Sequence, residues 1–293
     1  MKKRFLISLC FLAGVLFSAN AQQDAAGTLL GYSAKADSAG WKTSGLFGVT
    51  FGQTSLSNWS AGGDNTITGD FILNASANYM KGKWFWDNNL SLEYGMVYSS
   101  SYDWRKSTDK INLTSVTGRN ISSKWSTSFL LNFRTQFAKG YNYPNTDNHI
   151  STLMAPGYLD AALGFTYKPN AKYNVFLSPV TERATFVLDD FLSNAGQFGV
   201  KPGKKVKWET GAYVRATTNQ TIVENLNLIS TLDMFTPYSD NFGNVDMNWD
   251  LLLSYKINKL FTATLNTTLR YYDAEIQKVQ FKEILGLGFT YNF

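Results

Sequence analysis

Apolar and polar residues alternate with a period of two along most of the chain from Trp41 onward. Between residues 67 and 79, for example, Ile67, Phe71 and Leu73 fall on one face and Asn74 on the other. The same alternation recurs at 84–98, 125–137 and 245–257. Because successive side chains of a strand point to opposite faces, this pattern predicts β-strands and does not fit helices.

Applied to the whole chain, the alternation predicts an all-β protein of about twelve antiparallel strands. We expect the strands near 44–54, 67–80, 84–99, 108–118, 125–137, 158–168, 173–187, 205–217, 227–236, 245–257, 260–272 and 281–293. Most of them reach or exceed the roughly 9–11 residues that a tilted strand needs to cross a bilayer.

The connections between these strands alternate in length. Short turns are expected at Lys81-Gly82, Pro169-Asn170-Ala171 and Asn258-Lys259, with a less regular one at 218–226. The longer, polar connections are 55–66, 100–107, 138–157, 188–204, 237–244 and 273–280. Outer-membrane barrels have short periplasmic turns and longer extracellular loops. The pattern therefore predicts an up-and-down transmembrane barrel, and its even strand number places both termini in the periplasm.

The first residues carry a different signal. Lys2, Lys3 and Arg4 precede an apolar run at 5–17, and Ala19-Asn20-Ala21 supplies a cleavage site. This is the pattern of a signal peptide. We therefore assign 1–21 to a signal peptide cleaved near Ala21, 22–40 to a flexible periplasmic extension and 41–293 to the outer-membrane barrel.

Loss of this leader changes the charge and the thiol content. Without its three basic residues, the 27 Lys and Arg residues of the chain fall to 24, against 22 Asp and Glu residues. A nearly neutral chain offers no basic face, so we expect no nucleic-acid partner. The only cysteine, Cys10, lies in the leader. The mature protein is therefore expected to lack disulfides and cysteine-based metal sites.

The aromatic content helps to assign the two faces of the strands. Phe, Trp and Tyr make up 15% of the chain, although no apolar run after the leader is long enough for a membrane helix. In a barrel in lipid, the apolar face points outward and aromatic residues form girdles at the interfaces. We expect Trp84, Trp86 and Trp125 to belong to the periplasmic girdle.

The polar face then lines the interior. The charged residues predicted to line the lumen are Asp70, Glu93, Arg134, Glu209, Arg215, Asp233, Asp250 and Arg270. Isolated charges are costly in a dry interior, so these residues must pair with one another or contact water. Their carboxylates outnumber their arginines, which favours a weak preference for cations.

The end of the chain carries a membrane-assembly signal. Gly288, Tyr291 and the terminal Phe293 resemble the signature that the bacterial barrel-assembly machinery reads, in which a glycine precedes alternating aromatic residues. Gly286 stands where a polar residue is usual, which is a mild departure. The resemblance implies that this machinery is a partner during biogenesis.

A second resemblance lies near the start of the predicted barrel. The run Leu56-Ser57-Asn58-Trp59-Ser60-Ala61-Gly62-Gly63-Asp64-Asn65 resembles a motif of an uncharacterised family of Bacteroidota outer-membrane proteins. Within it, Asn58, Trp59, Gly62, Gly63 and Asp64 are the family-like residues. The resemblance implies a barrel in the outer membrane but no activity.

Few residues suggest chemistry. Asn148, His149 and Ser151 invite comparison with an outer-membrane phospholipase that uses a Ser-His-Asn arrangement, but we expect the single histidine, His149, to be a solvated loop residue. A single histidine also argues against a histidine-based metal site. The 199–207 run lacks the glycine spacing of a phosphate loop, so it is interpreted as a solvated basic loop, with attraction to glycolipid phosphates as an alternative.

Two functions remain open, with a lipid-modifying enzyme as a distant third. The preferred one is a narrow passive channel for ions or small polar solutes, and the alternative is a sealed barrel acting as a structural or accessory subunit. Neither implies an enzymatic reaction, a cofactor or a metal. The expected partners are outer-membrane lipid and lipopolysaccharide, and for a sealed barrel an outer-membrane protein.

Overall fold

The main element is one antiparallel sheet that closes on itself. The computed structural model describes residues 39–56, 64–239, 242–258 and 261–292. In this part of the chain, twelve strands follow one another around a closed barrel in the order β1-β14-β13-β12-β11-β10-β9-β8-β5-β4-β3-β2. The ring closes where β1 pairs with both β14 and β2. The predicted all-β fold and its twelve-stranded barrel are therefore confirmed.

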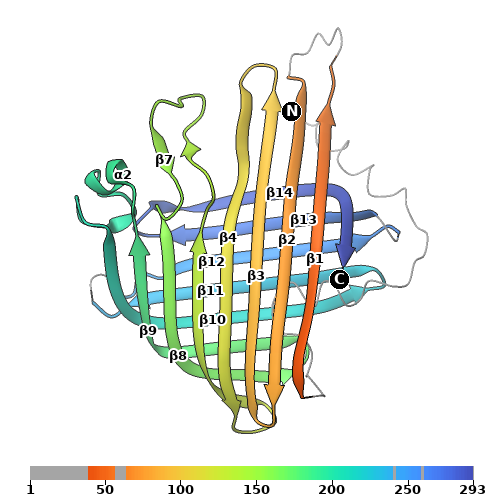
Figure 1. Cartoon of the computed structure of the whole chain (residues 1–293), viewed down its shortest axis with the longest axis vertical. Helices are drawn as coiled ribbons and strands as arrows, with labels where there is room; N and C mark the ends of the chain where they lie inside the picture. The colour runs from red at the N-terminus through yellow and green to blue at the C-terminus, as the bar shows by residue number, and fades with distance from the viewer. Residues whose placement is uncertain (1–38, 57–63, 240–241, 259–260, 293) are drawn as a thin grey trace, which may run out of the picture.

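The wall strands are long. They are β1 (Gly40–Thr54), β2 (Thr66–Lys81), β3 (Trp84–Ser99), β4 (Asp103–Asn120), β5 (Trp125–Thr135), β8 (Gly157–Asn170), β9 (Tyr173–Phe186), β10 (Val206–Val223), β11 (Leu226–Pro237), β12 (Asp246–Lys256), β13 (Phe261–Tyr272) and β14 (Ile276–Asn292). The strands are strongly tilted, since β1 to β4 run along the front of the barrel in Figure 1 while β10 to β13 cross steeply behind them. Closing a sheet into a barrel requires such a tilt.

Two of the predicted long loops are largely strand. β4 begins at Asp103 and β14 at Ile276, so only 100–102 and 273–275 connect these strands to their neighbours. Both pairings contain a register shift, between Gly95 and Met96 opposite β4 and between Arg270 and Tyr272 opposite β14. The shift at β4 inserts one residue and thereby reverses the side-chain pattern there. In β4 the sequence pattern therefore ended at the bulge, although the strand continues.

The turns at the opposite end are short, as predicted. The predicted bounds of the irregular turn, 218–226, were wrong. β10 continues to Val223, and the polypeptide turns at Glu224-Asn225, where Asn225 has φ 65°. Gly82 in the β2–β3 turn has φ 60°. Two-residue hairpins need such left-handed backbone, which Asn and Gly adopt at little cost.

The outer surface of the barrel is apolar and rich in aromatic rings. Trp84, Trp86 and Trp125 are all exposed near the short turns. Trp86 lies against Trp41, with ring centroids 5.5 Å apart, and Trp125 lies 4.7 Å from Tyr167. These rings occupy the place that was predicted for a girdle.

Two loops at the other end form a folded cap. The first connects β5 to β8 and contains β6 (Gly140–Tyr141) and β7 (His149–Ser151), and the second connects β9 to β10 and contains α2 (Asp190–Asn194) and η2 (Gln197–Gly199). Figure 1 shows the two loops together at one end of the barrel. Ala155, Val187, Leu192 and Val200 form a small buried core between them.

A close approach of backbone to backbone fixes the packing of β8 on β9. A Cβ atom on Gly164 would lie 2.0 Å from the backbone oxygen of Leu177, which cannot move without breaking the pairing. We therefore expect Gly164→Ala to destabilise the barrel by about 1–3 kcal/mol, as overpacking does. The urea midpoint of refolded protein, followed by its heat-modifiable mobility on gels, measures this loss.

Gly69→Ala is the matched control for this prediction. A Cβ atom at Gly69 would lie 3.9 Å from the ring of Phe51, which is an ordinary contact. Equal midpoints for the two variants would contradict the assignment of Gly164 as a packing constraint.

Candidate functional site

The candidate site is a polar cavity of about 240 Å³ inside the barrel. Residues of nine strands line it, and the loop between β5 and β8 adds Gln136 and Pro156. Ten of the lining residues are charged at neutral pH: Asp87, Glu93, Asp109, Asp233, Asp250, Lys110, Arg134, Arg215, Arg270 and Lys282. A polar cavity of this size has room for several water molecules.

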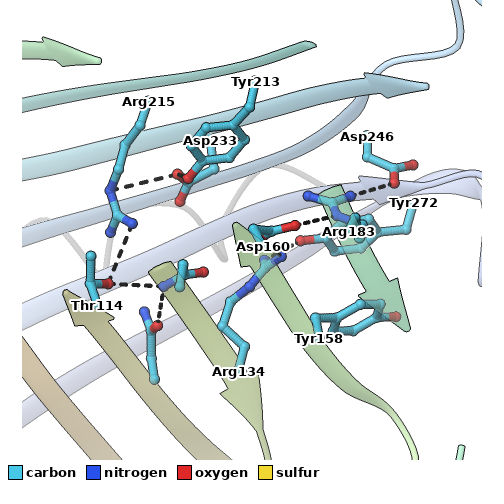
Figure 2. Close-up of polar contacts among 12 residues, drawn as sticks. Thr114, Arg134, Tyr158, Asp160, Arg183, Tyr213, Arg215, Asp233, Asp246 and Tyr272 are labelled. Carbon is cyan, nitrogen blue, oxygen red and sulfur yellow. Dashed lines mark hydrogen bonds and ion pairs between the residues drawn. The ribbon is translucent and has the colours of Figure 1, made fainter. Parts of the chain in front are cut away.

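The most deeply buried charge in the lumen is Asp160. Its side chain has no exposed surface and lies between two arginines, Arg183 at 2.5 Å from Oδ1 and Arg134 at 3.1 Å from Oδ2. Arg183 also contacts Asp246 at 3.0 Å, and its guanidinium lies 4.0 Å from the ring centre of Phe235. Figure 2 shows that the four charged residues of this network converge from β5, β8, β9 and β12. The network fixes four strands to one another through charge.

A second group connects opposite walls of the barrel. Lys110 on β4 lies 3.3 Å from Glu93 on β3 and 4.0 Å from Asp250 on β12. β4 and β12 are six strands apart in the ring of twelve, so they are diametrically opposed. The lysine side chain therefore reaches across the lumen.

Arg215 makes a third connection. Its Nε lies 3.6 Å from Asp233, and its terminal nitrogen donates to Thr114 of β4 at 3.4 Å. The hydroxyl of Tyr213 also donates to Asp233, as Figure 2 shows. Asp233 is therefore held by two neighbours on β10.

Two stacked tyrosines lie on the cavity wall nearer to the cap. The rings of Tyr158 and Tyr272 are 5.7 Å apart and nearly parallel, and Arg134 donates to the hydroxyl of Tyr272 at 2.5 Å. Tyr158 donates to Glu275 at 2.7 Å, and Arg270 pairs with the same carboxylate. These contacts again join strands on opposite sides of the barrel.

Part of the lumen is apolar and tightly packed. The buried cluster consists of Phe85, Val116, Leu130, Ala162, Phe176, Tyr213 and Phe235. These side chains point inward, on the same face as the charges, so the lumen is not uniformly polar. The polar cavity lies beside this cluster, and Val116 belongs to both.

The eight residues predicted to line the lumen fall into two groups. Six of them lie on the cavity wall: Glu93, Arg134, Arg215, Asp233, Asp250 and Arg270. The other two, Asp70 and Glu209, are not among the lining residues. Asp70 accepts a hydrogen bond from Ser107, and Glu209 pairs with Lys207 at 2.7 Å. The cavity also includes lysines and aspartates that sequence reasoning did not select. Its five acidic and five basic residues balance, so the expected acidic excess is wrong for this cavity.

Sequence reasoning missed the pair at the centre of the network, Asp160 and Arg183. A register shift lies between Leu163 and Phe165 where β8 pairs with β9, so the inward positions of β9 change from even to odd numbers near Pro179. Simple alternation from Phe176 places Arg183 outside. The Ser178-Pro179 pair was the available signal, because proline within a sheet marks an edge or a bulge.

Most of the family-like loop motif lies outside the described residues. This applies to Asn58, Trp59, Gly62 and Gly63, whereas Asp64 accepts a hydrogen bond from Ser101 at 2.5 Å. Of the membrane-assembly signal, Gly288 and Tyr291 belong to β14 and pair with Thr50 and Phe47, and Phe293 lies outside the described residues.

His149 is not a solvated loop residue, contrary to the expectation. Its side chain is 15% exposed, lies 3.1 Å from Asp189 and packs against the ring of Phe191. Burial raises the pKa of Asp189, but the N–H of Leu192 and the contact with His149 outweigh this effect, so the pKa lies below its ordinary value. Asp189 thereby caps α2 and links the two loops. No hydrogen bond joins His149 to Ser151 in the described part of the chain.

Within the described residues, no group of three or more His, Cys, Asp or Glu side chains is arranged to hold a metal ion. A search of their helices likewise finds none that is long and apolar enough to cross a membrane.

Comparison with known proteins places the chain beside a family without an assigned role. Residues 51–141 match a family model described as "Protein of unknown function (DUF3078)". A search of curated proteins finds no match.

Solved structures with a similar fold are distant. A COG4313 outer membrane channel from Pseudomonas putida F1 has 12% identity and a TM-score of 0.43, with 89% of this chain and 98% of that chain covered. The NanC porin has 8% identity and a TM-score of 0.40, covering 84% and 98%. The translocator domain of autotransporter NalP from Neisseria meningitidis has 9% identity and a TM-score of 0.36, covering 87% and 90%.

The Asp160 network yields a stability prediction. Asp160→Asn removes the charge that two buried arginines share, and an uncompensated buried charge costs about 3–5 kcal/mol. We expect a correspondingly lower urea midpoint for the refolded barrel. Asp190→Asn is the control, because Asp190 is 91% exposed in its pair with Lys205 and such pairs contribute about 0–1 kcal/mol. A midpoint for Asp160→Asn as high as that of the control would contradict the role of the network.

Proposed function

We propose that the protein is an outer-membrane β-barrel that provides a narrow passive path for water, ions or small polar solutes. The observation that carries this proposal is the polar cavity in the lumen, with its ten charged residues. A barrel with a purely structural role needs no such space. The proposal implies neither an enzymatic reaction nor a cofactor.

The outer surface supports the membrane location. Large apolar side chains remain exposed around the wall, including Leu163, Phe165, Trp208, Leu285 and Phe289. A soluble protein rarely exposes a continuous apolar surface of this kind, whereas a closed barrel in lipid requires it. A closed sheet is also one of the two structures that satisfy backbone hydrogen bonds in a bilayer.

The charges on the cavity wall set the selectivity of the proposed path. Acidic and basic residues are equal in number, and Lys110 lies between Glu93 and Asp250. A path with balanced charge favours neither cations nor anions strongly. Because Lys110 reaches across the lumen to Asp250, we expect its side chain to limit the size of the solute.

The alternative function, a sealed barrel acting as a structural or accessory subunit, is supported by the contacts across the lumen. Lys110 with Asp250 and Arg134 with Tyr272 join strands on opposite walls, and Tyr158 of β8 reaches Glu275 in the connection between β13 and β14. If these contacts are permanent, the cavity holds only trapped water. In that case the folded cap is the natural contact surface for a partner.

Single-channel recording in a planar bilayer distinguishes these two functions and tests the role of Lys110. We expect discrete steps with little ion selectivity from the native protein and a shift toward cations in Lys110→Gln. Removing one positive charge about 4 Å from the path changes the energy of an ion by about 1 kcal/mol in water, or roughly fivefold in the permeability ratio. The reversal potential in a salt gradient measures this ratio.

Lys201→Gln is the matched control, because Lys201 is exposed in the loop between β9 and β10 and carries the same charge. We expect its selectivity to equal that of the native protein. If protein that is shown to be folded gives no conductance steps, this result would contradict the channel and favour the sealed barrel.

A further inference from the structure

The closing pair of strands is joined over only part of its length. Among the residues that the structure describes, β1 pairs with β14 at five positions, from Leu46 opposite Asn292 to Thr50 opposite Gly288, whereas β1 pairs with β2 at fifteen. Beyond Thr50, residues 51–54 of β1 are not paired with residues 276–287 of β14 in the described part of the chain. Figure 1 shows β14 crossing the back of the barrel and turning sharply before it runs down beside β1.

The exposure of β14 agrees with a missing neighbour. Among its outward residues, Phe281 is 63% and Leu285 is 77% exposed, and Leu285 is the most exposed of the large apolar residues described. On β1, Phe51 at the same level is 68% exposed. Leu163 on β8, which has a paired strand on each side, is 62% exposed, so the higher value of Leu285 agrees with a missing neighbour on one side.

The inner face at this edge belongs to the cavity. Lys282 alternates with Phe281, points inward and lies on the cavity wall, and yet its side chain is exposed. None of the ion pairs between described residues includes Lys282. The cavity therefore reaches the edge of β14 with an ammonium group that interacts with Asp70 and Asp250 by charge but forms no close ion pair with them.

We propose that the gap between residues 51–54 of β1 and residues 276–287 of β14 is a side opening that connects the lumen cavity with the lipid and binds a fatty-acid-like amphiphile. The apolar chain lies over Phe281, Leu285 and Phe51 on the outside. The carboxylate accepts hydrogen bonds from Lys282 and from the free N–H groups of the β14 edge. This inference rests on the proposed membrane location, but it adds a lateral route to the axial one.

The backbone supplies the physical reason for such a ligand. The unpaired edge of β14 presents N–H and C=O groups, which are costly to leave unpaired in hydrocarbon. Water from the cavity or the oxygens of an acidic head group can satisfy these groups, whereas an acyl chain alone cannot. A ligand with both parts matches the apolar outer face and the polar inner face of the same edge.

Engineered disulfides test whether the gap exists. Continuing the register places Gln53 opposite Leu285, whereas Val49 already pairs with Phe289. In a Cys10→Ala background, which has no other thiol, we expect Val49→Cys/Phe289→Cys to oxidise readily and Gln53→Cys/Leu285→Cys to oxidise much more slowly. Equal rates would show that the edges are paired throughout and would overturn the proposal.

Thiol labelling in liposomes tests whether the gap leads from the lipid to the cavity. Ile284→Cys lies on the inner face of β14, and Asn266→Cys is its cross-strand neighbour on β13, behind fully paired strands. We expect N-dodecylmaleimide to label Ile284→Cys roughly thirtyfold faster than Asn266→Cys. Passage between paired strands breaks backbone hydrogen bonds, and breaking two of them at about 1 kcal/mol net each slows labelling by this factor. If only a water-soluble sulfonated maleimide labels the two cysteines, and N-dodecylmaleimide labels neither, this result would overturn the side opening, even if the protein conducts ions.

The same Ile284→Cys protein tests the ligand. We expect dodecanoate to slow its labelling by the sulfonated maleimide, and we expect Lys282→Met to abolish this protection. Absence of protection, or protection that survives Lys282→Met, would overturn the assigned ligand or its contact. A protein strand bound to this edge in native membranes would also overturn the proposal. In that case neither maleimide would label Ile284→Cys, whether or not dodecanoate is present. Heat-modifiable mobility verifies that each variant is folded.

Discussion

The pairing of β1 with β14 is the contact on which the rest of the structure depends. It closes the sheet into a ring, and only a closed ring gives the strands an inside and an outside. The ion pairs of the lumen, the exposed aromatic rings and the cavity all follow from that closure. The same contact is also the shortest in the wall, so the most important joint of the barrel is the one with the fewest paired residues.

The interior combines two ways of filling a barrel of intermediate size. An apolar cluster around Phe176 and Phe235 fills one part, and charged pairs fill another. The buried charges are tolerated where opposite charges contact them, as Arg134 and Arg183 contact Asp160. The space left between these two regions is the cavity, and its balanced charge follows from the need to pair every buried ion.

The cap and the side opening give two opposite sectors of the barrel different properties. The cap is held by its own small core and by contacts such as that of Leu188 with Met154, and it orders the loops over one sector of the barrel. On the opposite sector, near β1 and β14, the wall itself is incomplete. Access to the cavity is therefore expected to be uneven around the rim.

The sequence by itself determined the fold, the number of wall strands and the inward direction of most lumen residues, because a side chain's face follows from its place in the alternation. Glu93, Arg134 and Asp250 were found in this way. The alternation failed at bulges, which hid Arg183 and shortened the predicted β4. Only the tertiary structure decided which charges meet across the lumen, because Lys110 and Asp250 are far apart in the sequence and approach each other only when the ring closes.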